Sequence, residues 1–275
     1  MRKIWPRIED ALIYAALLTA VSIALFPLLW TLSTSFKRTE EYFTFPPVWI
    51  PRNPTLEHYI YVISTGGTDY LLNSMIIAGV NLLLVLMVSV PAAYAIARLR
   101  VGGNNFSFWI LSQRMFPPVA AIIPLFLLFS RLKLVDRYPS LILAYSTFNV
   151  AFAVWLLIGF FEEFPAEIED AALVDGCSRL RALLEIYVPM LAPGIIVAAL
   201  FCFIFSWNEF MFAMILTREA AKTITVKLAE FQAPTKILWG EMSALATISM
   251  VPVIAFAIFL QRYLVRGLAL GGVKG

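Results

Sequence analysis

Six long apolar stretches constrain what this chain can fold into more than any other feature of its sequence. Each stretch is near the ~20 residues that a helix needs to cross a bilayer. They are continuously apolar, whereas the strands of a membrane barrel alternate polar and apolar residues over ~10 positions. The sequence therefore predicts an all-α membrane protein with about six transmembrane helices and both termini on one side. The stretches lie at about 11–36, 71–99, 108–129, 141–160, 193–216 and 243–260.

Composition agrees with a lipid surrounding. Hydrophobic residues make up 61% of the 275 residues, charged residues make up 14%, and the mean hydropathy is +0.83. Soluble domains are about half apolar and one-quarter charged. Six spans and their loops occupy the whole length, so we expect a single transmembrane domain over residues 1–275. The formal charge of +3 is spread over many loops, which argues against nucleic acid as a partner.

Basic residues do not orient the protein. Lys and Arg normally accumulate on the cytoplasmic side of a membrane protein. Six spans place ten of them on each side when Arg114, within a span, is left out. The first stretch, 11–36, is longer than the apolar core of a signal peptide and is expected to be an uncleaved span.

Residues for catalysis or metal binding are scarce. Cys177 and Cys202 are the two cysteines, and they lack the close spacing of a zinc, haem or redox site. His58 is the one histidine and is expected at the surface of a polar, Pro-rich stretch. The chain has no Gly-rich phosphate loop for a nucleotide. We therefore expect no metal, no cofactor bound by this chain and no catalytic residue.

Residues 162–189 form an amphipathic, acidic segment between two spans. Pro165 suits the start of a short helix, and Gly176 suits its end. Ser178 then suits the cap of a second helix that ends near Pro189. Carboxylates in the first turns are favoured by the helix dipole. The sequence predicts a helix–Gly–helix elbow, and residues 162–189 are called the elbow below.

The first helix of the elbow has one narrow face with small residues. Ile168, Ala171, Ala172 and Asp175 share this face, and carboxylates flank it. Small side chains let a helix enter a groove of a partner, and carboxylates pair with that partner's Arg or Lys. The alternative is a helix resting on the membrane, but such helices are usually rich in Lys and Arg. The acidic sequence favours a protein partner.

The elbow also resembles a family motif. Its residues Asp170-Ala171-Ala172, Gly176 and Ile186-Tyr187-Val188-Pro189 follow the EAA signature of membrane subunits of binding-protein-dependent ABC importers. That signature runs E-A-A, three residues, G, nine residues, I-x-L-P. The sequence departs from it with Asp170 in place of Glu and Val188 in place of Leu. Further stretches resemble the carbohydrate-transporting, maltose-type branch: 73–74, 92–98, 115–118, 207–210 and 271–275.

The resemblance implies a permease subunit that forms half of a sugar pathway. The elbow would be a cytoplasmic coupling loop that docks on an ATPase subunit, and 37–70 would be an extracytoplasmic loop. Both termini would lie inside a prokaryotic cell (inner) membrane. The implied coupling residues are Glu169, Asp170, Ala171, Ala172, Asp175 and Gly176. The tail Gly272, Val273, Lys274 and Gly275 would reach toward the ATPase, or would be a frayed end.

The resemblance also implies partners. These are a second permease subunit, an ATPase dimer, an extracytoplasmic solute-binding protein, a sugar substrate and membrane lipid. ATP and Mg would bind to the partner ATPase. The alternatives are a self-sufficient secondary transporter or channel, which usually shows internal repeats or a charged pore ring, and an intramembrane enzyme, which needs a nucleophile, base or metal cluster. The sequence shows none of these features.

Polar residues within or at the ends of the predicted spans are candidates for a substrate path. Burying an ionisable group near the centre of a bilayer costs at least about 2.5 kcal/mol, so these residues should face the interior of the bundle. They either contact a sugar, with aromatic rings such as Tyr145, Phe148 or Trp207, or form interhelical hydrogen bonds. The candidates are Arg114, Asn149, Asn208 and Glu209.

Overall fold

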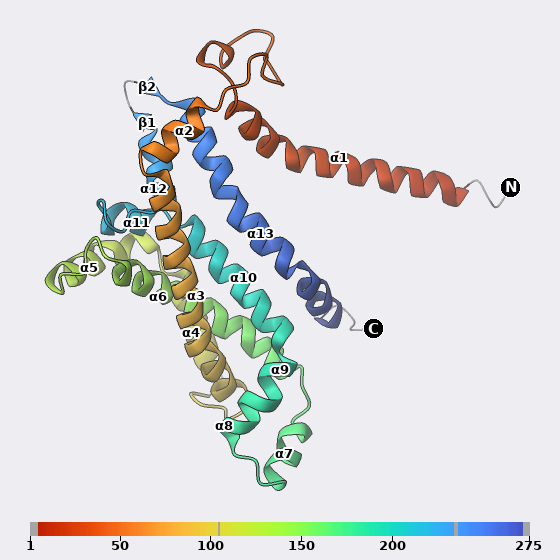
Figure 1. Ribbon diagram of the computed structural model, residues 1–275. Helices are drawn as coiled ribbons and strands as arrows, with labels where there is room; N and C mark the ends of the chain where they lie inside the picture. The colour runs from red at the N-terminus through yellow and green to blue at the C-terminus, as the bar shows by residue number, and fades with distance from the viewer. Residues whose placement is uncertain (1–4, 104, 234–235, 272–275) are drawn as a thin grey trace. The chain divides into compact units, whose positions relative to one another are not determined.

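The computed structural model describes residues 5–103, 105–233 and 236–271 (Figure 1). Contacts divide the chain into two compact units. Unit 1 contains Met1–Thr68 and Leu228–Val251, and unit 2 contains Asp69–Lys227 and Pro252–Gly275. Helix α13 (Trp239–Gly271) contributes to both units, which divide at Pro252 inside it.

The described residues form four helices that are long and apolar enough to cross a membrane. These are α1 (Trp5–Thr34), α3 (Gly67–Ala97), α6 (Tyr138–Glu162) and α13. The number rises to six if each of two bent helix pairs is one span. The first pair is α4 (Phe106–Met115) with α5 (Pro118–Arg131), bent by 88°, and the second is Arg179–Met190 with α10 (Ala192–Asn208), bent by 78°. The predicted all-α membrane class is confirmed.

Two predicted spans are interrupted. The stretch 108–129 breaks where Phe116 and Pro117 take extended conformations, because a residue that precedes proline avoids the helical region. Pro118 then begins α5. The stretch 193–216 breaks at Glu209, which is also extended, and α11 (Met211–Leu216) follows. These two predicted spans are therefore present as bent helix pairs, one for each stretch.

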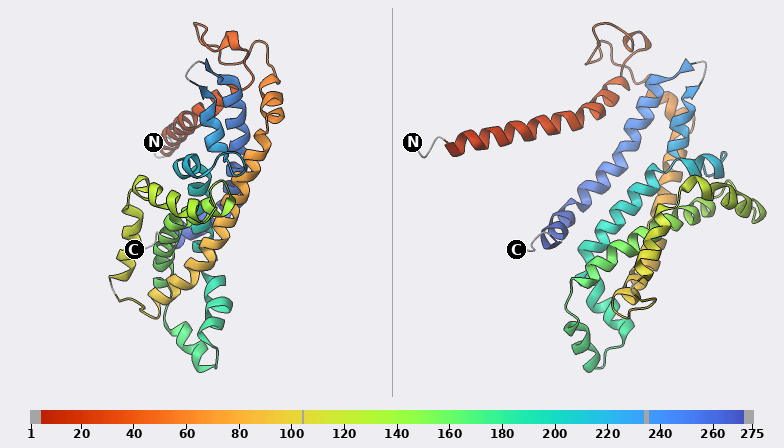
Figure 2. Two further views of the ribbon diagram at one scale, coloured as in Figure 1. Left: turned by 90° about the vertical axis from the view of Figure 1, so that its left-hand side faces the viewer. Right: turned by 180° about the vertical axis from the view of Figure 1, so that it is seen from behind.

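Helices α3, α6 and α10 build the main core of unit 2, and α6 and α10 lie side by side (Figures 1 and 2). Small residues at their contact let the two backbones approach, as is common between membrane helices. Gly194 on α10 is the tightest example: a Cβ there would lie 2.6 Å from Cγ of Phe160 on α6. Buried core residues include Val85, Ala153, Leu157, Ala198 and Cys202.

Two neighbouring side chains of α3 hold the backbone of residues 217–224, which lie far along the sequence, against that helix. The amide of Asn73 donates to the carbonyls of Ala220 (3.2 Å) and Lys222 (2.9 Å), and Ser74 Oγ accepts from the backbone N–H of Ile224 at 2.9 Å. Helix α12 (Ile224–Glu230) begins at this point. The Asn73-Ser74 pair therefore positions a loop across about 150 residues of sequence.

Asp136 fixes the same loop from another direction. Its carboxylate accepts hydrogen bonds from the backbone N–H groups of Arg218, Glu219, Ala220 and Ala221 at 2.9–3.3 Å. Burial by itself would raise the pKa of this carboxyl, but the four N–H groups favour the charged form and bring the pKa below its ordinary value. The charged carboxylate therefore stabilises the fold.

Replacing Asp136 with asparagine is expected to lower the free energy of unfolding by about 2 kcal/mol, because the amide offers one acceptor oxygen in place of two charged ones. The folded-state pKa lies below the unfolded value of about 3.9. The carboxylate's contribution is therefore present above the unfolded pKa and is lost as the pH falls through the folded pKa. Thermal unfolding in detergent, followed from pH 7 to pH 3, measures this difference.

The exposed Asp10→Asn variant is the matched control, and its Tm should equal that of the wild type. The account of Asp136 is contradicted if the Tm difference between wild type and Asp136→Asn is absent at pH 7, or if it persists unchanged at the lowest pH.

In unit 1, residues 37–68 include helical segments of their own. They contain η1 (Thr39–Glu41) and α2 (Glu57–Ser64). The expectation that His58 lies at the surface was wrong: it is 8% exposed, and its Nε2 is 2.9 Å from the carbonyl oxygen of Lys37 and 3.0 Å from the Tyr42 hydroxyl. Two short strands, β1 (Gln232–Ala233) and β2 (Lys236–Ile237), pair antiparallel in this unit.

Candidate functional site

The elbow has the predicted helix–Gly–helix form. Helix α7 (Glu167–Val174) ends before Gly176, whose φ of +84° lies in the left-handed region that favours glycine. Ser178 then caps α8 (Arg179–Ala182), since its Oγ accepts from the backbone N–H of Arg181 at 3.4 Å. Gly176 therefore ends the first helix, and Ser178 caps the second, as the sequence predicts.

The second arm of the elbow continues toward α10. A π-helical turn, η2 (Leu183–Tyr187), follows α8 and leads into α9 (Val188–Met190). π-Helical turns are rare and occur frequently at functional sites. The chain bends near Leu191, between α9 and α10. The elbow is therefore connected to the core helix α10 by a bent but nearly continuous helical path.

The six predicted coupling residues do not share one environment. Asp170, Ala171, Asp175 and Gly176 are exposed, and Ala172 is partly exposed. Glu169 is different, because it is only 8% exposed and accepts hydrogen bonds from two tyrosines of the same chain. The exposed residues are free to meet a partner, whereas the Glu169 carboxylate is engaged inside the fold.

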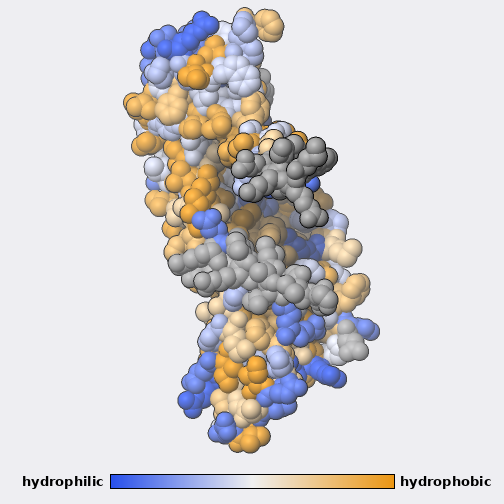
Figure 3. Space-filling model, turned by 90° about the vertical axis from the view of Figure 1, so that its right-hand side faces the viewer, coloured by the Kyte–Doolittle hydropathy of each residue, from blue (hydrophilic) through white to orange (hydrophobic). Residues whose placement is uncertain are grey.

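Apolar side chains of the elbow are also exposed. Val174 is 88% exposed, Leu180 66% and Leu184 57%. Figure 3 shows hydrophobic residues among hydrophilic ones at the lower end of the molecule, where Figure 1 places α7 and α8. Apolar side chains beside carboxylates are typical of a surface that another protein covers.

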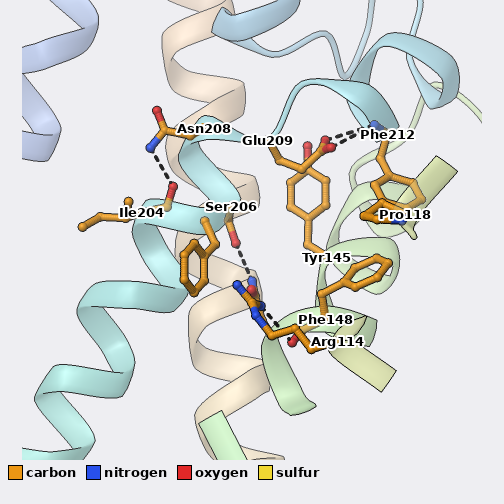
Figure 4. A pocket seen from close by; sticks show the side chains of 11 residues that line it. Arg114, Pro118, Tyr145, Phe148, Ile204, Ser206, Asn208, Glu209 and Phe212 are labelled. Atoms are coloured by element: carbon orange, nitrogen blue, oxygen red, sulfur yellow. Dashed lines mark hydrogen bonds between the residues drawn. The ribbon is translucent and has the colours of Figure 1, made fainter. Parts of the chain in front are cut away.

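A cavity of about 320 Å³ lies within unit 2, between α4, α5, α6 and the break that follows α10 (Figure 4). The structure brings all four predicted polar residues of the membrane region to its wall: Arg114, Asn149, Asn208 and Glu209. Aromatic rings supply much of the remaining lining. These include Tyr145, Phe148, Phe205 and Phe212.

Arg114 brings a positive charge to this cavity. Its guanidinium lies over the rings of Phe205, at 4.3 Å from the centroid, and Phe152, at 5.0 Å, and it donates to the carbonyl of Phe148 at 3.4 Å. No carboxylate of the described side chains forms a salt bridge with it. Stacking on aromatic rings lowers the cost of holding this cation in the membrane region.

Glu209 and Asn208 stand where α10 ends. The Glu209 carboxylate accepts from the backbone N–H groups of Phe212 (3.0 and 3.1 Å) and Ala213 (3.2 Å), so it caps α11. The Tyr145 side chain points toward it (Figure 4). Asn208 donates to the carbonyl of Ile204 at 2.9 Å and keeps its amide oxygen available. These groups give the cavity both donors and acceptors.

Asn149 belongs to a buried hydrogen-bond network. Its amide donates to Asn81 Oδ1 at 2.8 Å and to Ser206 Oγ at 2.9 Å, and Asn81 donates to Ser146 Oγ at 2.9 Å. The network joins α3, α6 and α10, which is the interhelical role that the sequence left open. Asn81 was not among the polar residues that were predicted from the sequence. A single Asn inside a long apolar stretch is the signal that could have found it.

The lining of the cavity suits the binding of a polar solute. Donors, acceptors and aromatic faces are the groups that contact a polar, hydroxyl-bearing solute. Within the described part of the chain, no group of three or more His, Cys, Asp or Glu side chains could hold a metal ion.

Comparison with known proteins identifies the family. The sequence pattern of the family described as binding-protein-dependent transport system inner membrane component matches residues 86–270. The chain belongs to this family. The resemblance that the elbow motif predicted is therefore confirmed, and it extends well beyond that motif.

Individual relatives cover nearly the whole permease. This chain is 34% identical to the sulfoquinovosyl glycerol transport system permease protein of Agrobacterium fabrum, over 91% of this chain and 89% of that protein. It is 35% identical to the trehalose/maltose transport system permease protein of Thermococcus litoralis, over 96% of both chains. A solved bacterial ABC transporter, involved in the import of the acidic polysaccharide alginate, is similar with a TM-score of 0.77 and 25% identity, over 94% of this chain and 97% of the solved one.

Membership of this family decides between the alternatives that the sequence left open. The permease is a transport subunit of an ABC importer and not an enzyme, and the ATPase is a separate polypeptide. The predicted C-terminal residues Gly272, Val273, Lys274 and Gly275 lie outside the described residues.

Proposed function

We propose that this permease forms half of the membrane pathway of an ATP-driven sugar importer, beside a second permease subunit. Its further partners are an ATPase dimer and an extracytoplasmic solute-binding protein. The relatives named for sulfoquinovosyl glycerol, for trehalose and maltose, and for alginate all act on carbohydrates, which supports a sugar as substrate. A solved alginate transporter of the same fold is in complex with a periplasmic protein bound to an alginate pentasaccharide.

The exposed residues of the elbow are the observation that supports an ATPase partner. Carboxylates of Asp170 and Asp175 lie on the same short segment as the small residue Ala171 and the exposed apolar side chain of Val174. Small residues allow a helix to enter a cleft, and carboxylates pair with Arg or Lys of its walls. This docking places the elbow and both termini in the cytoplasm of a prokaryotic cell, and residues 37–70 outside.

The cavity of unit 2 is proposed as part of the sugar path. Arg114 offers hydrogen-bond donors and the Asn208 amide oxygen offers an acceptor to sugar hydroxyls, and the rings of Phe205 and Tyr145 offer faces for the sugar ring. Asn149 mainly holds the helices together, since its amide is engaged by Asn81 and Ser206. ATP and Mg bind to the partner ATPase, and no cofactor binds to this chain.

Reversing the charge of the exposed carboxylates should release the ATPase. We expect Asp170→Lys/Asp175→Lys to lower the amount of ATPase that co-purifies with the permease about fivefold, since two exposed ion pairs of about 0.5 kcal/mol each sum to about 1 kcal/mol. The permease is co-expressed with its partner permease and ATPase subunits and purified in detergent. The ratio of ATPase to permease is then measured.

The matched control is Glu40→Lys/Glu57→Lys, which reverses two exposed carboxylates in residues 37–70. This variant should retain as much ATPase as the wild type. Equal loss in both variants, or no loss in either, would contradict docking through the elbow.

A further inference from the structure

Glu169 differs from the other carboxylates of α7 in its partners. Its Oε1 accepts from the hydroxyl of Tyr94 on α3, and its Oε2 accepts from the hydroxyl of Tyr187 at 3.0 Å, at the end of the π-helical turn. Glu167 and Asp170, on the same helix, are exposed. One carboxylate therefore joins α7 to α3 and to the second arm of the elbow.

The hydrogen bonds from Tyr94 and Tyr187 to Glu169 lie in an apolar, buried environment. Tyr94 is 5% exposed and Tyr187 1%, and the ring of Phe161 packs against both, with centroids 5.8 and 5.5 Å away. Hydrogen bonds to a carboxylate are about twice as strong as neutral ones, and a low dielectric strengthens them further. A group placed in this way holds its neighbours in one arrangement.

Arg98 adds a second connection, one helical turn beyond Tyr94. Its guanidinium donates to the carbonyl of Phe164, just before α7, and lies 5.2 Å from the ring centroid of Tyr187. The end of α3 thus holds the chain on both sides of α7. A displacement of the elbow cannot leave α3 in place without breaking these contacts.

We infer that Glu169 is a positioning residue that transmits movement of the docked elbow to α3 and toward α10, through Tyr94 and Tyr187. This inference rests on the proposed function and divides the acidic residues of α7 between two tasks. Asp170 and its exposed neighbours bind the ATPase, whereas Glu169 passes the movement inward. Sites are coupled in this way when one packed element has two discrete arrangements that both sites bias.

The inference predicts uncoupling without loss of assembly. The complete importer, with its partner permease, ATPase and solute-binding protein, is reconstituted in proteoliposomes. We expect Glu169→Ala to retain the ATPase but to raise the ATP hydrolysed per sugar transported at least about fivefold, the lower end of usual allosteric coupling. Tyr94→Phe removes one hydroxyl, preserves the packing of the ring and should give a smaller rise in the same direction.

The control is Glu167→Ala, which removes an exposed carboxylate two residues away and should leave the ratio unchanged. A wild-type ratio in folded Glu169→Ala and Tyr94→Phe would overturn the inference and leave the proposed function intact. Loss of the ATPase from Glu169→Ala would also overturn it, because Glu169 would then belong to the docking contact. A wild-type permease that never retains an ATPase would overturn both.

Discussion

Replacing Gly194 with valine is expected to destabilise the permease by about 3 kcal/mol, near the upper range for overpacking a tight contact. The reason is the tight contact between Gly194 on α10 and the Phe160 ring on α6: a Cβ at Gly194 would lie 2.6 Å from Cγ of Phe160, and valine adds two further methyl groups. The helices must separate along a contact that supports the main core of unit 2. The yield of monodisperse protein and its Tm in detergent measure the effect.

A second substitution separates this clash from a loss of helix propensity. Phe160→Ala in the Gly194→Val background should recover part of the lost Tm, because it removes the ring that the valine meets. Gly159→Val is the matched control, since a Cβ at exposed Gly159 meets no atom within 4 Å. The packing account fails if Gly159→Val costs as much as Gly194→Val, or if Phe160→Ala brings no recovery.

Replacing Gly176 with valine is expected to lower ATP-driven transport by more than tenfold with the membrane helices still folded. Gly176 has a φ of +84°, and an L-residue in the left-handed region costs about 1–2 kcal/mol, more for a β-branched one. Space is not the obstacle, because no atom lies within 4 Å of a Cβ built there. The loss therefore comes from misplacing α7 relative to α8. Sugar uptake by the reconstituted importer measures it.

Gly176→Asn is the discriminating variant, because asparagine tolerates the left-handed conformation. It should keep most of the uptake, although its side chain is nearly as large as that of valine. If asparagine and valine are equally harmful, the side chain blocks a contact surface and backbone conformation is not the cause.

The sequence predicted the parts of the fold that local patterns control. The six apolar stretches, the Gly176 stop and the Ser178 cap depend on residues close together in the chain, and each is present in the structure. Both bent spans were predicted, but the positions of their breaks were not, because a continuous apolar composition does not show where a helix is interrupted. The signals were nevertheless there: a pair of prolines at 117–118, and the polar pair at 208–209 that ends α10.

Residues whose roles depend on distant partners could not be assigned from the sequence. Glu169 is one helical position from Asp170, and its burial follows from where the end of α3 places Tyr94. His58 is buried because Tyr42 and the Lys37 carbonyl fold around it. In the sequence, Asp136 looks like an ordinary loop carboxylate, because its four N–H partners come from the distant residues 218–221. In each case the partner lies too far along the chain for periodicity or capping rules to reveal it.

On the proposed function, this chain transports sugar only as the permease of an ATP-driven assembly. The most direct test measures uptake of labelled sugar into proteoliposomes that contain either this chain alone or the complete set of permease, ATPase and solute-binding subunits. We expect uptake only by the complete set, and only with ATP on the side of the elbow. Uptake by the chain alone, without ATP, would contradict it and would identify a self-sufficient transporter.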